Sequence, residues 1–111
     1  MDSKKSKLYS DAYKNIETKG PYKLGPLSSE KFRVDPQYVM FQMSRYKHVA
    51  RLLSNKKNII DIGPGDGIGL PILSSYFDSV TAVDIDQHML ENSKKFLDKE
   101  FSCNFILNDF S

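Results

Sequence analysis

The second half of the chain alternates short apolar runs with segments in which apolar residues recur at helical spacing. The apolar runs are rich in β-branched residues and predict strands at 58–62, 79–83 and 104–107. The segments between them, 68–76 and 87 to about 100, predict two helices. This order is typical of an α/β domain with a parallel sheet and right-handed crossovers.

The first half of the chain has a weaker pattern. From residue 36 to about residue 53, apolar and aromatic residues recur at helical spacing, with Asp35 as the expected N-cap and Pro36 at the first helical position. Before that helix, glycine and proline turn signals interrupt the chain, and only residues 9–16 are compatible with a short helix. The chain therefore divides into an irregular N-terminal arm, 1–35, and the N-terminal portion of an α/β domain, 36–111.

The first predicted strand, 58–62, is a continuous apolar run of the kind that is buried on both faces in a parallel sheet. We expect it to be central in its sheet. Because the sequence ends at Ser111, directly after the third strand, one edge of the first strand lacks a predicted partner. A bare apolar edge promotes aggregation. The chain is therefore expected to be a fragment of a longer protein, or to have this edge covered by an oligomer or a partner chain.

A glycine-rich turn follows the first strand, with Asp61 ahead of glycines at alternate positions from 63 to 67. Such glycines let the backbone adopt positive φ and approach a ligand closely, while the helix beyond aims free N–H groups at it. A carboxylate here favours a ligand with an ammonium and a sulfonium over a pyrophosphate. The dinucleotide fingerprint Gly-x-Gly-x-x-Gly also fails, because its last position falls on Ile68 or Leu70.

The pattern Asp-x-Gly-x-Gly-x-Gly at 61–67 resembles the first motif of the class I, Rossmann-like methyltransferases that use S-adenosylmethionine. The resemblance covers about residues 58–110. It implies an α/β, Rossmann-like three-layer fold with a parallel sheet, of which the N-terminal half is present here, preceded by a helical arm. It also implies direct displacement, in which an acceptor atom attacks the sulfonium methyl group and S-adenosylhomocysteine leaves.

The resemblance further implies a set of donor-binding residues. Asp61 and the backbone of the glycine turn would face the methionine end of the donor. Asp84, at the end of the second strand, lies at the distance from the turn at which an acid accepts both ribose hydroxyls. Asp84 would equally suit a nicotinamide dinucleotide, so that only the glycine spacing separates the two ligands. The expected cofactor-binding residues are Asp61, Gly63, Pro64, Gly65, Gly67, Asp84, Ile85, Asp109 and Phe110.

At the adenine end, the resemblance assigns Asp109 to the amino group and the Phe110 N–H to a ring nitrogen. Ile85 would lie against the adenine face, with packing in the core as an equal alternative. Asp66 is expected to support the glycine turn, and Asp86 to cap the following helix.

No catalytic base emerges from the sequence. His48 and His88 are expected to be partly exposed structural residues, and no ligand spacing for a metal is present. The segment ahead of the first strand often forms a lid in similar methyltransferases, and Arg33 with Tyr38 would then orient an anionic acceptor. A helix packed on the sheet is the alternative for this aromatic and basic segment, which also contains Phe32, Phe41, Arg45 and Tyr46.

The composition of the chain limits its possible partners and its location. Sixteen basic residues against 14 acidic ones give a net charge of +2, which indicates neither nucleic acid nor an anionic membrane as a partner. Cys103 is the only cysteine, and no run is long enough for a membrane span, so the cytoplasm is expected. The predicted function is therefore methyl transfer from S-adenosylmethionine to an unidentified small-molecule or other acceptor, with a small molecule as the expected partner. Alternatives are a non-catalytic donor-binding or protein-interaction module and, third, a nicotinamide-dependent oxidoreductase.

Overall fold

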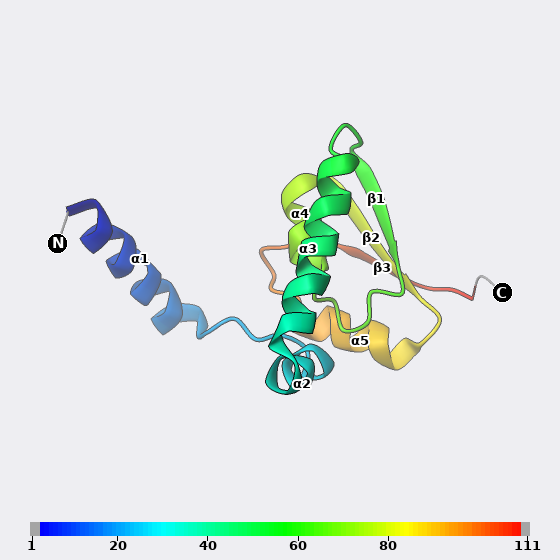
Figure 1. Ribbon diagram of the computed structural model, residues 1–111, viewed down its shortest axis with the longest axis horizontal. Helices are drawn as coiled ribbons and strands as arrows, with labels where there is room; N and C mark the ends of the chain where they lie inside the picture. The colour runs from blue at the N-terminus through cyan, green and yellow to red at the C-terminus, as the bar shows by residue number, and fades with distance from the viewer. Residues whose placement is uncertain (1–2, 110–111) are drawn as a thin grey trace.

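The computed structural model describes residues 3–109, of which residues 3–5 are described by their backbone alone. The elements in chain order are α1 (Ser3–Lys19), α2 (Pro26–Val34), α3 (Pro36–Leu52), β1 (Asn58–Ile62), α4 (Leu70–Tyr76), β2 (Ser79–Asp84), α5 (Gln87–Phe96) and β3 (Asn104–Leu107). The strands lie where the apolar runs predict them, and the α/β class is confirmed (Figure 1).

The three strands are parallel and pair in the order β1-β2-β3. Asp61 lies opposite Ala82, and Asp84 lies opposite Leu107. Because the strands are parallel and in chain order, their carboxyl ends meet at the same edge of the sheet. Among the described strands β2 is the middle one, so β1 is not central and one of its edges has no strand beside it.

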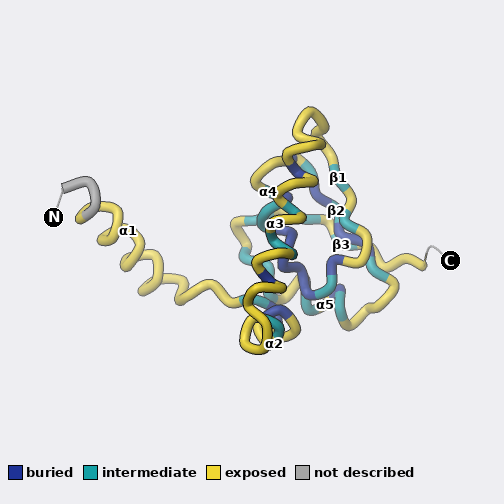
Figure 2. The backbone as a smooth tube through the Cα atoms, viewed as in Figure 1, coloured by how far each residue is buried: buried dark blue, intermediate teal, exposed yellow. Residues whose placement is uncertain are grey.

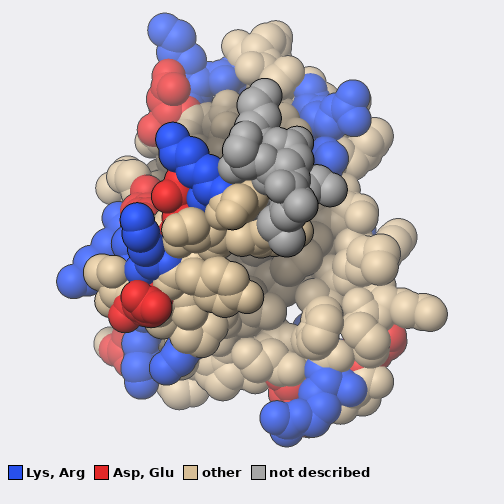
Figure 3. Space-filling view, turned by 90° about the vertical axis from the view of Figure 1, so that its left-hand side faces the viewer, with Lys and Arg blue, Asp and Glu red and all other residues tan. Residues whose placement is uncertain are grey.

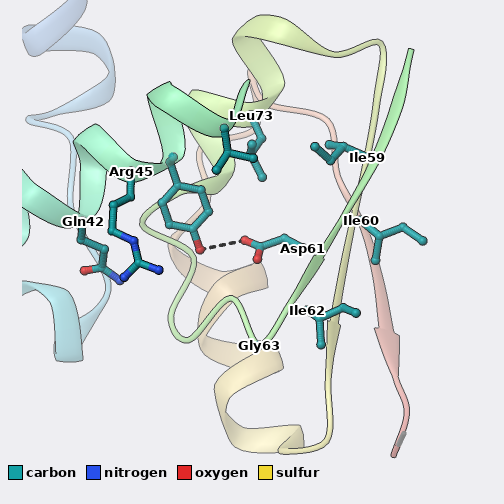
Figure 4. Close-up of a pocket in the computed structure, with 10 residues that line it drawn as sticks. Gln42, Arg45, Ile59, Ile60, Asp61, Ile62, Gly63 and Leu73 are labelled. Atoms are coloured by element: carbon teal, nitrogen blue, oxygen red, sulfur yellow. Dashed lines mark hydrogen bonds between the residues drawn. The ribbon is translucent and has the colours of Figure 1, made fainter. Parts of the chain in front are cut away.

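Helices α3, α4 and α5 lie on the same face of the sheet and enclose the core (Figure 1). Val80 and Ala82 of β2 are buried there, together with Leu70 and Leu73 around α4. The opposite face is open. Ile60 and Ile62 point away from the helices in Figure 4 and are 62% and 66% exposed. The prediction that β1 is buried on both faces is therefore wrong for the described residues, because no described helix covers the second face.

The N-terminal arm is more regular than the turn signals suggest. Helix α1 runs through residues 3–19, projects from the body of the molecule and is exposed along its described side chains (Figures 1 and 2). An ion pair between Lys19 and Glu100 ties its end to the turn before β3. Helix α2 begins at Pro26 and packs against α3. The prediction of an irregular arm is wrong because Gly20 and Pro26 only mark helix ends, whereas the domain division at residue 35 stays a prediction.

Helix ends follow local hydrogen bonds. Asp35 caps α3 by accepting from the Tyr38 N–H at 3.1 Å, as predicted. Helix α5 stops at Phe96, earlier than the predicted residue 100, because Asp98 forms a competing turn. The Asp98 side chain accepts from the Glu100 N–H at 3.0 Å, and its carbonyl accepts from Phe101. None of the helices among the described residues is both long enough and apolar enough to cross a membrane.

Candidate functional site

The glycine turn between β1 and α4 has the backbone geometry that its sequence predicts. Gly63, Gly65 and Gly67 have φ values of 71°, 64° and 89°, in the left-handed region that disfavours side chains. A Cβ added at Gly63 or Gly65 would meet no atom within 4 Å. These two glycines are therefore required by conformation and not by crowding, and their backbone faces open space.

The turn is held in place from the sheet and from α5. The Gly63 N–H donates to the Val83 carbonyl of β2, and the Ser93 hydroxyl of α5 donates to the Gly65 carbonyl, both at 2.8 Å. Gly67 is buried, and a Cβ there would press on Leu70 and Ser93. Pro64 is also buried. These two residues shape the turn, and their contact with a donor stays a prediction.

A third anchor comes from the N-terminal arm. Asp66 is buried, and its carboxylate accepts from the Ser28 N–H at 2.8 Å and from the Ser28 hydroxyl. Ser28 is the third residue of α2, whose N-cap, Gly25, has no side chain to accept this bond. Asp66 therefore caps α2 from 38 residues away in the chain. A Cβ at Gly25 would collide with the Asp66 side chain, which explains the glycine there.

Asp61 faces the helices from β1. Its carboxylate accepts a hydrogen bond of 3.0 Å from the Tyr46 hydroxyl of α3, the dashed line in Figure 4. Burial raises the pKa of Asp61 to about 6; the Tyr46 hydrogen bond opposes this rise and the charge of Asp84 adds to it. Burial is also the main reason that the pKa of Tyr46 is raised. The Tyr46 ring lies so close to Gly69 that a Cβ there would collide with it.

From the sequence alone, Tyr46 is assigned only to an aromatic and basic segment. A stronger signal was present, because Val39, Met43, Tyr46 and Ala50 recur at helical spacing and form the face of α3 that is turned inward. A tyrosine on a buried helix face needs a partner for its hydroxyl. The sequence did not indicate which acid would be that partner.

Asp61 and Tyr46 line a cavity of about 370 Å³ between α3 and β1 (Figure 4). Its remaining lining residues are Gln42, Arg45, Val49, Ile59, Ile60, Ile62, Gly63 and Leu73. The cavity thus joins a carboxylate, a guanidinium and the first glycine of the turn.

Asp84 ends β2 and is partly buried. Its side chain accepts from the Asp86 N–H at 3.0 Å, which orients the carboxylate. Asp86 caps α5, as predicted, by accepting from His88 and Met89. Ile85 is 67% exposed, so the alternative that it packs in the core is wrong. After burial, the charge of Asp84 also raises the pKa of Asp61, so the carboxylates at the ends of β1 and β2 lie close enough to interact.

The remaining predicted residues lie after β3 and in the segment ahead of β1. Asp109 is exposed and follows β3, as predicted, while Phe110 lies outside the described residues. Arg33 pairs with Glu30 at 3.1 Å, and the Lys31 ammonium lies over the ring of Tyr38, so a role of Arg33 and Tyr38 toward an acceptor stays a prediction.

Histidines and metal ligands are the remaining groups that could supply chemistry. His48 and His88 are exposed, and neither lines the cavity beside Asp61. Within residues 3–109 no group of three or more His, Cys, Asp or Glu residues is placed to hold a metal ion.

Charge is distributed unevenly along the chain. In the view of Figure 3, Lys and Arg stand in several separate groups, some of them interleaved with Asp and Glu. Residues 36–60, which comprise α3, the following turn and the start of β1, contain no Asp or Glu. The cations in this stretch are all exposed, and they are Arg45, Lys47, Arg51, Lys56 and Lys57. This part of the surface is therefore cationic although the whole chain is nearly neutral.

Comparison with known proteins agrees with this site. The sequence model of the family described as "Ribosomal RNA adenine dimethylase" matches residues 40–110, which include most of α3, the three strands and the glycine turn. No individual curated protein matches the chain. Enzymes of this family are methyltransferases that use S-adenosylmethionine, so the predicted enzyme class and cofactor are confirmed.

The match also corrects a prediction. A small-molecule acceptor without nucleic acid was expected, and this is wrong because the family acts on ribosomal RNA. The net charge of +2 was misleading, because it averages a cationic stretch at 36–60 with acids elsewhere. The match covers more than half of the chain, and the chain therefore belongs to the ribosomal RNA adenine dimethylase family of S-adenosylmethionine-dependent methyltransferases.

Proposed function

We propose that this chain carries the donor site of an enzyme that methylates adenine in ribosomal RNA. The observation that carries the proposal is the glycine turn with three positive φ values, which follows Asp61 on β1 and is hydrogen-bonded to β2, the strand that Asp84 ends. The site fits the donor, because open space over Gly63 and Gly65 lies beside a carboxylate suited to an ammonium group.

Each predicted residue has a proposed role in that site. Asp61 binds the ammonium of the methionine end, and the Gly63 and Gly65 backbone allows the donor to approach closely. Asp84 accepts the ribose hydroxyls, since a carboxylate has lone pairs for several donors besides the Asp86 N–H. Ile85, exposed beside Asp84, forms an apolar wall for the adenine ring.

Asp109 is proposed to bind the donor's adenine amino group from beyond the end of β3. The Phe110 N–H is proposed to bind a ring nitrogen of the same adenine. This assignment rests on the sequence alone, because Phe110 lies outside the described residues. Pro64 and Gly67 act indirectly, because both are buried and fix the shape of the turn.

The bound donor supplies a methyl group that is already activated by its sulfonium. When the exocyclic nitrogen of the acceptor adenine attacks this methyl carbon, an N–C bond forms and the C–S bond breaks. S-adenosylhomocysteine leaves, and the nitrogen releases a proton. The residues described here hold and orient the donor, which accounts for a large part of catalysis when the donor is preactivated. None of them is placed as the base that receives the proton.

Ribosomal RNA as the acceptor is supported by the family and by the exposed cations of residues 36–60. Phosphate groups bind such cations and release their own counterions, so this term gives affinity without sequence readout. The cytoplasmic location expected from the sequence agrees with a ribosomal acceptor and stays a prediction.

The test has two arms. Calorimetric titration of the chain with S-adenosylhomocysteine should show saturable binding that Asp84→Ala weakens, with a nicotinamide dinucleotide as the comparison ligand. Methyl transfer should then be measured on unmethylated ribosomal RNA, with nucleoside analysis for methylated adenosine and with double-stranded DNA as the comparison acceptor. Failure to bind S-adenosylhomocysteine would refute the donor site, and methylation of DNA in preference to ribosomal RNA would refute the acceptor.

A further inference from the structure

The cavity beside Asp61 places opposite charges on two different elements. Arg45 and Gln42 enter it from α3, while Asp61 and Gly63 enter it from β1 and the glycine turn (Figure 4). Arg45 lies close enough to act electrostatically on the Tyr46 hydroxyl, which donates to Asp61. A guanidinium and a carboxylate are thus presented to the same small volume.

This arrangement suits a ligand that carries both charges within a few bonds. The α-amino-acid end of the donor has an ammonium and a carboxylate on one carbon. A guanidinium binds a carboxylate through two parallel N–H···O bonds, whereas an aspartate accepts from an ammonium. Both interactions are charge-assisted, and each is stronger than a neutral hydrogen bond.

Resting on the proposed donor site, we propose that α3 completes the pocket for the donor's methionine end. Arg45 binds the donor's carboxylate, and Tyr46 is a positioning residue that orients the Asp61 carboxylate toward the donor's ammonium. Neither residue belongs to the glycine motif that marks the donor site in the sequence.

Tyr46 is built to hold a fixed position. Its ring packs against the backbone at Gly69, where any side chain would collide with it, and the hydroxyl reaches Asp61 at 3.0 Å. Binding one carboxylate oxygen fixes the orientation of the whole group. The close approach of α3 to the start of α4 therefore determines where Asp61 points.

The charges around Asp61 come from several elements. Tyr46 donates to it from α3, Asp84 repels it from β2, and Arg45 lies near the Tyr46 hydroxyl. The Cys103 thiol, just before β3, has a pKa that is raised mainly by burial and in addition by the charge of Asp61. Burial raises the pKa of Asp61 to about 6, and the Tyr46 hydrogen bond opposes this rise. Without the Tyr46 hydroxyl the pKa of Asp61 should move higher still.

The first experiment measures S-adenosylhomocysteine affinity against pH for the 111-residue chain and for Tyr46→Phe. Wild-type affinity should fall as the pH drops through about 6, because the protonated Asp61 no longer attracts an ammonium. In Tyr46→Phe the fall should begin at a higher pH. Tyr76→Phe, at the exposed end of α4, is the matched control. Superimposable pH profiles for Tyr46→Phe and the wild type would overturn the positioning role.

The second experiment compares S-adenosylhomocysteine with 5′-methylthioadenosine, which lacks the amino-acid end. Arg45→Gln should weaken S-adenosylhomocysteine binding roughly 10- to 100-fold, the range for a lost hydrogen bond to a charged group, and leave 5′-methylthioadenosine unchanged. Arg45→Lys, which keeps the charge but not the fork, should lose less. Arg51→Gln, a cation of the same helix outside the cavity, is the control. A thermal melt of each variant separates lost binding from lost folding.

The outcomes separate the inference from the proposed function. If the wild-type chain binds neither ligand, the donor site itself is refuted. If it prefers S-adenosylhomocysteine but Arg45→Gln keeps that preference, only the role of Arg45 is overturned. Equal losses for both ligands in a folded Arg45→Gln variant would also overturn it, because they would indicate a general change in the pocket.

Discussion

Two aspartates five positions apart in the same glycine motif have different environments. Asp66 is 5% exposed and accepts two hydrogen bonds from Ser28, so the protein itself satisfies much of its hydrogen-bonding capacity. Asp61 is partly buried, accepts from Tyr46 and faces a cavity, and burial raises its pKa to about 6. The difference indicates that Asp66 stabilises the fold, whereas Asp61 keeps capacity for a positively charged ligand.

Within one short motif, one acid therefore stabilises the fold and the other can bind a ligand. A carboxylate that is enclosed and hydrogen-bonded by its own chain gains nothing from a ligand. A carboxylate that is desolvated but incompletely paired has a raised pKa, and such groups concentrate at functional sites.

The largest effect is expected from Asp66→Ala. The substitution leaves the Ser28 N–H and hydroxyl buried without their acceptor and removes the cap of α2, so the free energy of unfolding should fall by about 3 kcal/mol. Chemical denaturation measures this change. Asp78→Ala, an exposed acid in the turn between α4 and β2, should leave stability nearly unchanged. Similar losses in both variants would contradict the structural role of Asp66.

Asp61→Asn should weaken ligand binding without lowering stability, which is the opposite of the effect expected for Asp66→Ala. It should weaken S-adenosylhomocysteine binding by about 2 kcal/mol, because an amide does not attract the ligand's ammonium as a carboxylate does. Calorimetric titration gives the affinity, and a thermal melt should show no loss of stability, since a desolvated charge has been removed. A variant that binds normally but unfolds more easily would reverse the proposed assignment of the two acids.

The stability of the chain should depend on the protonation of Asp61. Its folded pKa of about 6 lies above the value of an unfolded Asp, so the folded state binds the proton more tightly. The stabilisation is complete below pH of about 4 and is lost as the pH rises through about 6, by on the order of 1–2 kcal/mol. Denaturation at several pH values measures it. Asp61→Asn should remove this contribution, and an unchanged pH profile in that variant would refute it.

The smallest effects are expected from substitutions of α3 cations that lie outside the cavity beside Asp61. Lys47→Gln and Arg51→Gln should each reduce the salt dependence of ribosomal RNA binding by about 1 in the logarithmic slope, with a modest loss of affinity. Filter binding at several salt concentrations measures both. The affinity for S-adenosylhomocysteine should stay constant, and a parallel loss there would indicate that α3 itself is disturbed.

Local patterns in the sequence predicted the framework well. The three strands lie at the predicted residues, Asp35 and Asp86 cap the helices they precede, and the glycines of the turn adopt positive φ. These features depend on backbone conformation and on periodicity over a few residues. The error in the length of α5 is also local, because the side chain of Asp98 forms a turn that helical periodicity does not reveal.

The sequence by itself determined the order of strands and helices, the glycine geometry and the acids at the strand ends. Only the tertiary structure decided that Asp66 caps α2, that Tyr46 of α3 binds Asp61, and that Arg45 shares their cavity. The physical reason is that periodicity and turn chemistry act between neighbours in the chain. Pairing between side chains depends instead on how closely packed elements approach, and here glycines at 25 and 69 permit the two decisive approaches.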